Sequence, residues 1–121
     1  VVFQKPGFEE LVKRVIGLPG ERISIRDGSV YINGQKLAED YLPPSLYTKG
    51  GDLIEDGGES KIVPEGFYVC LGDNRTVSLD SRFSTIGFID RNWIKGKVFL
   101  RWWPLEKFGV ISSGTYKIVG Q

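Results

Sequence analysis

Hydrophobic and polar residues alternate along the first third of the chain, which is the pattern of half-buried β-strands. Within residues 22–26, Ile23 and Ile25 fall on one face and polar side chains fall on the other. The Asp27-Gly28 pair that follows is a strong hairpin-turn signal, and the alternation resumes over residues 29–32. The sequence therefore predicts a β-hairpin centred on this turn.

Further turns and apolar runs predict that strands continue beyond the hairpin. Asn33-Gly34 supplies a second turn into residues 35–37, which completes a short meander. Helical periodicity is weak, and sixteen glycines disfavour long helices, so we expect an all-β fold. The other predicted strands are residues 1–4, 11–16, 62–63, 67–71, 93–103 and 115–119.

Residues 40–65 have a different character from the strands on either side. Pro43-Pro44, Gly50-Gly51 and Gly57-Gly58 interrupt this segment among acidic and hydroxyl residues. We expect an extended surface excursion, with at most a short ribbon around Leu53-Ile54.

Length and charge limit what the chain can be. Its 121 residues suit one domain, and 40% hydrophobic residues suffice for an ordinary core. The formal net charge is only +1, which gives no broad electrostatic argument for nucleic acid, so we expect none as a partner.

The sequence has no histidine and a single cysteine. The absence of imidazole excludes serine-histidine-aspartate chemistry, papain-like chemistry and histidine-rich metal sites within this chain. Cys70 lies in an apolar run, where a buried structural thiol is the more frequent role than a nucleophile. No apolar run is long enough for a spanning helix, and the start lacks both methionine and a signal-peptide pattern. We therefore expect a soluble, excised fragment that begins within a strand.

Lys13 is the first candidate for chemistry. It stands in an apolar run with Val12 and Val15, where a charged amine is costly to desolvate. The site must pair this amine or favour its neutral form, which accepts protons. Strand alternation predicts that Lys13 and Arg14 point to opposite sides. A snorkelling lysine on an edge strand is the structural alternative.

Residues 72–82 form the second candidate region, a loop of small, acidic and basic residues. Asp80 and Arg82 are two apart and suit a hydrogen-bonded ion pair that holds the loop, and Asp73 is a possible partner for Arg14. Ser78 alone would suit an ordinary turn serine. A metal site is disfavoured because the interleaved arginines neutralise the carboxylates, so we expect neither metal nor cofactor.

Two strings in these regions closely resemble type I signal peptidases, which are membrane-anchored serine proteases with a serine-lysine dyad. They are Lys-Arg-Val-Ile-Gly-Leu-Pro-Gly at 13–20, and Gly-Asp-Asn-Arg with Ser-Leu-Asp-Ser-Arg at 72–82. The resemblance implies a small barrel-like fold of coiled mixed or antiparallel sheets over residues 1–111. Residues 112–121 would form a C-terminal strand or tail.

The resemblance also assigns roles to individual residues. Lys13 matches the general base, and Ser78 matches the hydroxyl that orients the lysine. The nucleophilic serine has no match, because in the family it lies upstream of the strand represented by residues 1–4. Departures at Thr76-Val77 and at residues 83–87 affect expected substrate contacts. The residues that match the supporting loop and strand are Arg14, Gly72, Asp73, Asn74, Arg75, Asp80, Ser81 and Arg82.

For the intact protein, the resemblance implies an endopeptidase that removes signal peptides from secretory preproteins at Ala-X-Ala-like sites. Such an enzyme would be anchored in a bacterial membrane, with its catalytic domain on the extracytoplasmic side. The fragment itself is expected to be inactive, since it lacks the serine.

Aromatic residues near the C-terminus have two interpretations. They are core residues by default, but some could form an exposed patch that contacts the membrane interface. The residues concerned are Trp93, Trp102, Trp103 and Phe108.

Two other functions stay open at this point. A self-cleaving, repressor-type protease shares the serine-lysine chemistry but would not ordinarily include the long excursion. A non-catalytic β module would keep the scaffold to bind peptides or partner proteins. A Ser-Met-x-Pro-like segment and an apolar anchor encoded before Val1 would favour the peptidase.

Overall fold

The computed structural model describes residues 1–96, and within this range the chain is built from short β-strands and one 3-10 helix, without an α-helix. The predicted all-β class is therefore confirmed. The elements are β1 Val2–Phe3, β2 Leu11–Val12, β3 Arg14–Gly17, β4 Arg22–Arg26, β5 Ser29–Ile32, β6 Gln35–Lys36, β7 Lys61–Ile62, β8 Phe67–Leu71, β9 Ile89–Asp90, η1 Arg91–Trp93 and β10 Ile94–Gly96.

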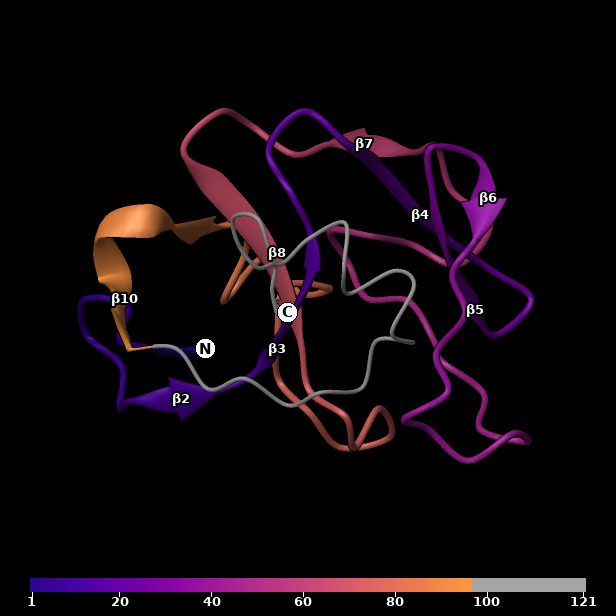
Figure 1. The fold of residues 1–121 in the computed structure, drawn as a ribbon, viewed down its shortest axis with the longest axis horizontal. Helices are drawn as coiled ribbons and strands as arrows, with labels where there is room; N and C mark the ends of the chain where they lie inside the picture. Colours follow the sequence, from indigo (N-terminus) through magenta and orange to yellow (C-terminus); the bar gives the residue numbers. More distant parts are fainter. Residues whose placement is uncertain (97–121) are drawn as a thin grey trace.

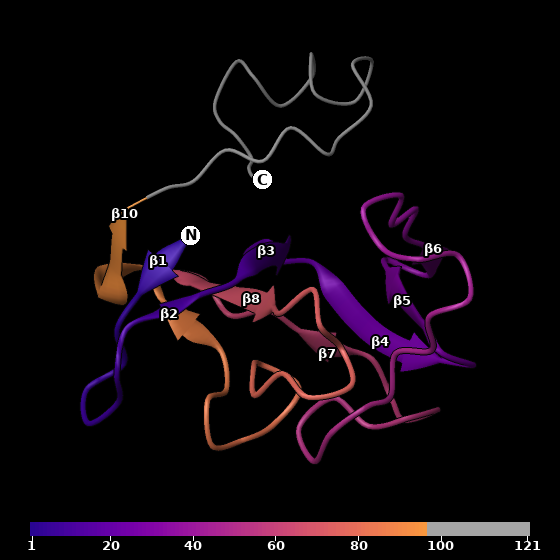
Figure 2. The same cartoon turned by 90° about the horizontal axis from the view of Figure 1, so that it is seen from below.

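The strands form three antiparallel sheets, with strand orders β10-β1-β2, β3-β8-β9 and β6-β5-β4-β7. Figure 1 shows the long β3 and β8 pair between the β10-β1-β2 sheet on the left and the β4–β7 sheet on the right. The same order is seen from below in Figure 2, where the loop that follows β8 lies beneath the strands. The central pair thus connects two halves of the described structure.

The predicted hairpin and meander are present. β4 pairs with β5 in the register Ile25 to Val30, and β5 pairs with β6 in the register Ile32 to Gln35. Asp27 and Gly28 have φ values of 51° and 79°, so both central turn residues are left-handed. Two left-handed residues match the strand twist that a two-residue hairpin needs.

The core consists of two buried clusters on either side of the β3–β8 pair. Ile16 packs into one cluster, together with residues of β4, β5 and β8, whereas Val15 packs into the other with Phe3 and Cys70. A bulge between Val15 and Gly17 interrupts the pairing of β3 with β8. Neighbouring residues of one strand therefore supply both clusters.

The prediction of one continuous strand over residues 11–16 is wrong at Lys13. The chain is extended on both sides, but Lys13 itself belongs to neither β2 nor β3. β2 pairs with β1 and β3 pairs with β8, so the strand changes partner at this residue. The Lys13 backbone is still held by Val1, because its N–H donates to the Val1 carbonyl oxygen at 3.0 Å and its carbonyl oxygen accepts from the Val1 amino group at 2.7 Å.

The excursion is only partly a surface segment. Ile54 is fully buried in the first cluster, and no ribbon forms around it; an isolated parallel bridge joins Ile25 to Asp56 instead. The predicted strand from residue 93 is also shorter at its start, since Trp93 ends η1 and β10 begins at Ile94. The rest of that strand, the predicted strand at 115–119, the tail at 112–121, and Trp102, Trp103 and Phe108 lie outside the described residues.

Candidate active site

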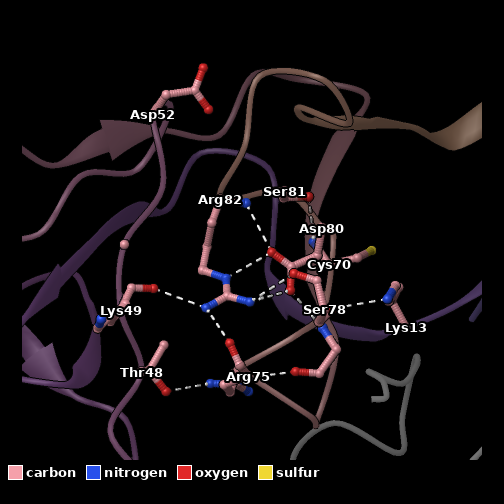
Figure 3. A network of polar contacts seen from close by, with 12 residues as sticks. Lys13, Thr48, Lys49, Asp52, Cys70, Arg75, Ser78, Asp80, Ser81 and Arg82 are labelled. Atoms are coloured by element: carbon pink, nitrogen blue, oxygen red, sulfur yellow. Dashed lines mark hydrogen bonds and ion pairs between the residues drawn. The ribbon is translucent and has the colours of Figure 1, made fainter.

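Lys13 and Ser78 meet at the centre of the candidate site. The Lys13 Nζ donates a hydrogen bond of 2.9 Å to the Ser78 Oγ, as Figure 3 shows. β3 pairs Arg14 with Leu71, so the same antiparallel register brings Lys13 beside Gly72, where the loop of residues 72–82 begins. The lysine is half-buried, whereas the sequence predicted a more enclosed position.

Gly72 is the residue against which this pair packs. A Cβ atom built on Gly72 would lie 2.1 Å from the Ser78 Oγ and 3.2 Å from the Lys13 Nζ. Any side chain here would push the two functional groups apart, which explains why the loop starts with glycine.

A buried ion pair lies directly behind the lysine-serine pair. Asp80 and Arg82 are almost completely buried, and Arg82 Nε and Nη2 donate to the two carboxylate oxygens at 2.8 and 3.0 Å. Asp80 also accepts from the Gly72 N–H at 3.0 Å. The predicted pair of Asp80 with Arg82 is thus present, and it holds the first residue of the loop as well as the last.

The electrostatics of Asp80 follow from these contacts. Burial by itself raises the pKa of the carboxyl, but hydrogen bonds from Arg82 and from the Gly72 N–H outweigh it and lower the pKa below its usual value. The carboxylate therefore stays ionised and holds the Gly72 and Arg82 ends of the loop together.

Arg82 connects the loop to itself and to the excursion. Its remaining N–H groups donate to the carbonyl oxygens of Arg75 at 3.0 Å, Ser78 at 3.3 Å and Lys49 at 2.9 Å. A guanidinium has five N–H donors, and here they all meet oxygen acceptors. The backbone on either side of Ser78 is therefore held from one buried side chain.

Arg14 and Asp73 form the second predicted ion pair. Arg14 donates from Nε and Nη2 to the two Asp73 oxygens at 2.9 and 2.6 Å, in the two-point geometry that suits arginine and carboxylate. The Arg14 guanidinium also lies over the Tyr41 ring, with Cζ 3.9 Å from the ring centre. β3 and the loop are thereby joined next to Lys13.

Ser81 and Asn74, two further predicted loop residues, have structural positions. Ser81 is buried, and its Oγ accepts from the Cys70 N–H at 3.0 Å, so it fixes the loop to β8. Asn74 is exposed and accepts from the Thr76 hydroxyl, and its backbone oxygen accepts from the Ser78 N–H at 2.9 Å. Both residues shape the turn that carries Ser78.

Sequence reasoning missed the partners of Arg75. Its Nη2 lies 2.6 Å from Glu39 Oε2, its Nη1 donates to Thr48, and its Nε donates to the Gly72 carbonyl oxygen at 2.6 Å. Glu39 also accepts from the Tyr41 hydroxyl at 2.6 Å. No local sequence pattern links Arg75 to Glu39, because the pairing spans 36 residues of sequence.

Burial and charge act together in this group as well. Burial alone lowers the pKa of Arg75, but the hydrogen bond and the charge of Glu39 raise it above its usual value. Burial also raises the pKa of Tyr41, and Glu39 adds to that effect, so the tyrosine remains a neutral donor.

A cavity of about 740 Å³ opens beside Ser78, between the excursion and the loop. Its lining includes the exposed apolar side chains of Tyr47, Val77 and Leu79 together with Lys49. Val77 is one of the two residues at which the loop departs from the family pattern, and it is 75% exposed. The cavity therefore combines an apolar surface with access to Ser78.

The backbone at Val1 also lies beside Lys13. The Val1 α-amino group donates to the Lys13 carbonyl oxygen at 2.7 Å, and burial lowers the pKa of this amine. Residues 1–96 hold no group of three or more Asp, Glu or Cys side chains placed to bind a metal ion. Within the same residues, no helix has the length and hydropathy required to traverse a bilayer.

Comparisons with known proteins identify the family of this chain. A family model described as signal peptidase, peptidase S26, matches residues 1–103. Signal peptidase IB of Staphylococcus aureus (strain Mu50 / ATCC 700699) is 41% identical over 118 residues, which cover 89% of this chain and 61% of that protein. Signal peptidase I of Bacillus caldolyticus is 43% identical over 115 residues, with 89% and 62% covered. The chain thus spans about three fifths of the length of these relatives.

A solved structure agrees with the sequence comparisons. The crystal structure of a signal peptidase I from Enterococcus faecalis V583 superposes with a TM-score of 0.65 at 34% sequence identity, covering 81% of this chain and 91% of that one. Because the family model covers most of the chain and the fold agrees, the chain belongs to the signal peptidase family, peptidase S26.

Proposed function

We propose that this chain is the base-bearing part of a serine endopeptidase that removes N-terminal signal peptides from secreted proteins. The observation that carries the proposal is the 2.9 Å contact between Lys13 Nζ and Ser78 Oγ in a sequence without histidine. Amide hydrolysis by an alcohol needs a group that takes the hydroxyl proton and returns it to the leaving amine. A lysine amine can take that proton in its neutral form and return it as the ammonium, and Ser78 accepts a hydrogen bond that holds the amine in place.

The nucleophilic alcohol in this proposal is a serine that precedes Val1 in a longer polypeptide. The hydrogen bond from Val1 to the Lys13 carbonyl supports this origin, because a segment joined to Val1 starts next to the base. The 121 residues alone are accordingly proposed to be inactive. In the intact protein we place this domain on the extracytoplasmic side of a bacterial membrane, attached by an anchor that also precedes Val1.

The substrate in this proposal is an extended peptide with small residues before the cleaved bond, of the Ala-X-Ala type. The cavity beside Ser78 supports a peptide ligand, since apolar side chains and a few polar groups line it. A main chain that pairs with the strand edges around Lys13 would add affinity without requiring a particular sequence.

Substitution of Lys13 in the polypeptide that includes the upstream serine tests the base. We expect Lys13→Ala to lower kcat/KM by about 10²- to 10⁴-fold on a signal-peptide substrate, the range for loss of a general base. The control is Lys36→Ala, which removes an exposed lysine from β6. Circular dichroism should show the same fold in both variants. Full cleavage by Lys13→Ala would contradict the base assignment.

Ser78→Ala in the same polypeptide tests the orienting hydroxyl. We expect kcat to fall severalfold or more with a modest change in KM, because the lysine amine loses the group that holds it. Ser60→Ala, at an exposed serine, is the control. Unchanged turnover would reduce Ser78 to a structural part of the loop. Peptide binding without cleavage in the wild type would instead favour a non-catalytic β module.

A further inference from the structure

We propose that Glu39 is a positioning residue for the Lys13–Ser78 pair, and that it acts through Arg75 on the Gly72 peptide. This inference deepens the proposed function and rests on it. Glu39 lies ahead of the excursion and contacts neither Lys13 nor Ser78 through a described hydrogen bond, so its effect has to be transmitted.

The first step of the transmission is the contact of Glu39 with Arg75. Both Glu39 oxygens accept from the guanidinium, at 2.6 and 3.2 Å, and the Tyr41 hydroxyl donates to one of them. The Arg75 side chain is completely buried and the Glu39 side chain is 10% exposed. A buried guanidinium needs an anionic partner, and Glu39 supplies it.

The second step is the contact of Arg75 with Gly72. The Arg75 Nε donates to the Gly72 carbonyl oxygen at 2.6 Å, while the Gly72 N–H donates to Asp80 at 3.0 Å. Two buried charged side chains thus hold the residue from opposite ends, one at its N–H and one at its carbonyl. Arg75 depends on Glu39 for its orientation, whereas Asp80 depends on Arg82.

The third step is the packing of Gly72 against the functional groups. Its Cα is so close to Ser78 that an added Cβ would lie 2.1 Å from the Oγ and 3.2 Å from the Lys13 Nζ. Such close contact means that a rotation of the Gly72 peptide displaces the Ser78 hydroxyl or opens a gap behind it. Glu39 therefore restricts the position of the hydroxyl that orients the base.

A pair of neighbouring carboxylates provides the test. Glu39→Gln removes one negative charge and keeps the side-chain size, and Asp40→Asn removes one from the exposed adjacent residue. In the polypeptide with the upstream serine we expect Glu39→Gln to lower kcat about tenfold with KM within about twofold, and Asp40→Asn to change neither. If Glu39 had a purely structural role, Glu39→Gln would lower thermal stability without lowering kcat selectively at a nearly constant KM.

Amide resonances of the 121-residue chain give a readout that does not depend on activity. We expect Glu39→Gln to shift the ¹H–¹⁵N signals of Gly72 and Ser78, and Asp40→Asn to leave them in place. If wild type cleaves no signal peptide, the proposed function fails, while these shifts still decide the inference. Unmoved Gly72 and Ser78 signals, or an unchanged kcat in an active enzyme, would overturn it.

Tyr41→Phe covers the case in which Glu39→Gln does not fold. This substitution removes the hydroxyl that donates to Glu39 and keeps the ring that faces Arg14. We expect a smaller loss of kcat in the same direction, together with a smaller shift of the Gly72 signal. Wild-type kcat and an unmoved Gly72 signal in Tyr41→Phe would overturn the inference in that case.

Discussion

At the scale of single residues, the site is a set of buried charges that satisfy one another around one glycine. Asp80 with Arg82 and Glu39 with Arg75 approach Gly72 from its two ends. Each pair is costly to desolvate, and each becomes damaging when one member is removed, because the other charge is left buried. This dependence makes the residues around Gly72 sensitive to small substitutions.

Asp80→Asn should therefore destabilise the chain in a pH-dependent way. We expect a loss of about 3–5 kcal/mol in the free energy of unfolding at pH 7, because Arg82 keeps its charge without an anion. The pKa of Asp80 is lowered in the folded state, so its contribution is full above the unfolded value of about 3.9 and disappears as pH falls through the folded value. Urea titrations at pH 7 and at about pH 3 measure this.

The comparison of wild type with Asp80→Asn supplies the criterion. The gap between their unfolding free energies should narrow in acid, whereas Asp40→Asn should follow wild type at both pH values. If the difference in free energy of unfolding between wild type and Asp80→Asn stays constant or widens in acid, the carboxylate charge does not stabilise this loop.

Part of this arrangement of charged residues could be predicted from the sequence. The pairs of Asp80 with Arg82 and of Asp73 with Arg14 were predicted because their members stand close in the motif or match it. The Lys13–Ser78 contact was predicted from the resemblance, and the catalytic roles of both residues stay a prediction. Glu39 was not found, since no local pattern relates it to a loop 36 residues away.

At the scale of elements, turns were more predictable than the excursion. Asp27-Gly28 and Asn33-Gly34 specify their turns through left-handed backbone angles, a local property. Residues 40–65 have no regular alternation of apolar and polar positions, and their order comes from contacts with residues distant in the sequence. Ile54 packs into the first cluster, and the N–H of Ile54 donates to the Arg82 carbonyl oxygen. Such contacts depend on the whole fold.

Ile54→Ala measures what that contact contributes. The side chain is fully buried, so we expect a loss of about 2–5 kcal/mol in the free energy of unfolding, as for other large apolar truncations. Ile62→Ala is the control, because Ile62 is 51% exposed. Limited proteolysis should cut the excursion faster in Ile54→Ala alone. Equal stability of the two variants would mean that Ile54 is not a core residue.

At the scale of the whole molecule, β3 and β8 join the two clusters into one folding unit. Val15 and Cys70 belong to one cluster, whereas Ile16, Val69 and Leu71 belong to the other. A strand pair that supplies both clusters cannot lose one and keep the other. The apolar runs predicted these strands, but the bulge and the change of partner at Lys13 arise from tertiary pairing.

The reactivity of the Cys70 thiol measures whether the two clusters unfold together. Burial raises the pKa of its thiol to about 12, so the folded chain presents almost no thiolate to a reagent. We expect an aromatic disulfide reagent at about pH 8 to react only with unfolded chains. Reactivity and circular dichroism should then give the same urea midpoint. Rapid stoichiometric labelling in native buffer, or two separate midpoints, would contradict a single unit.

The hydrogen bond from Val1 to the Lys13 carbonyl has a practical consequence for chemical synthesis. A peptide N–H donates as an amine does, so acylation of this terminus preserves the bond. A short synthetic peptide coupled at that point by semisynthesis would emerge beside the lysine without disturbing the ladder. Isotopic labels or unnatural alcohols can thereby be introduced next to the amine, one atom type at a time.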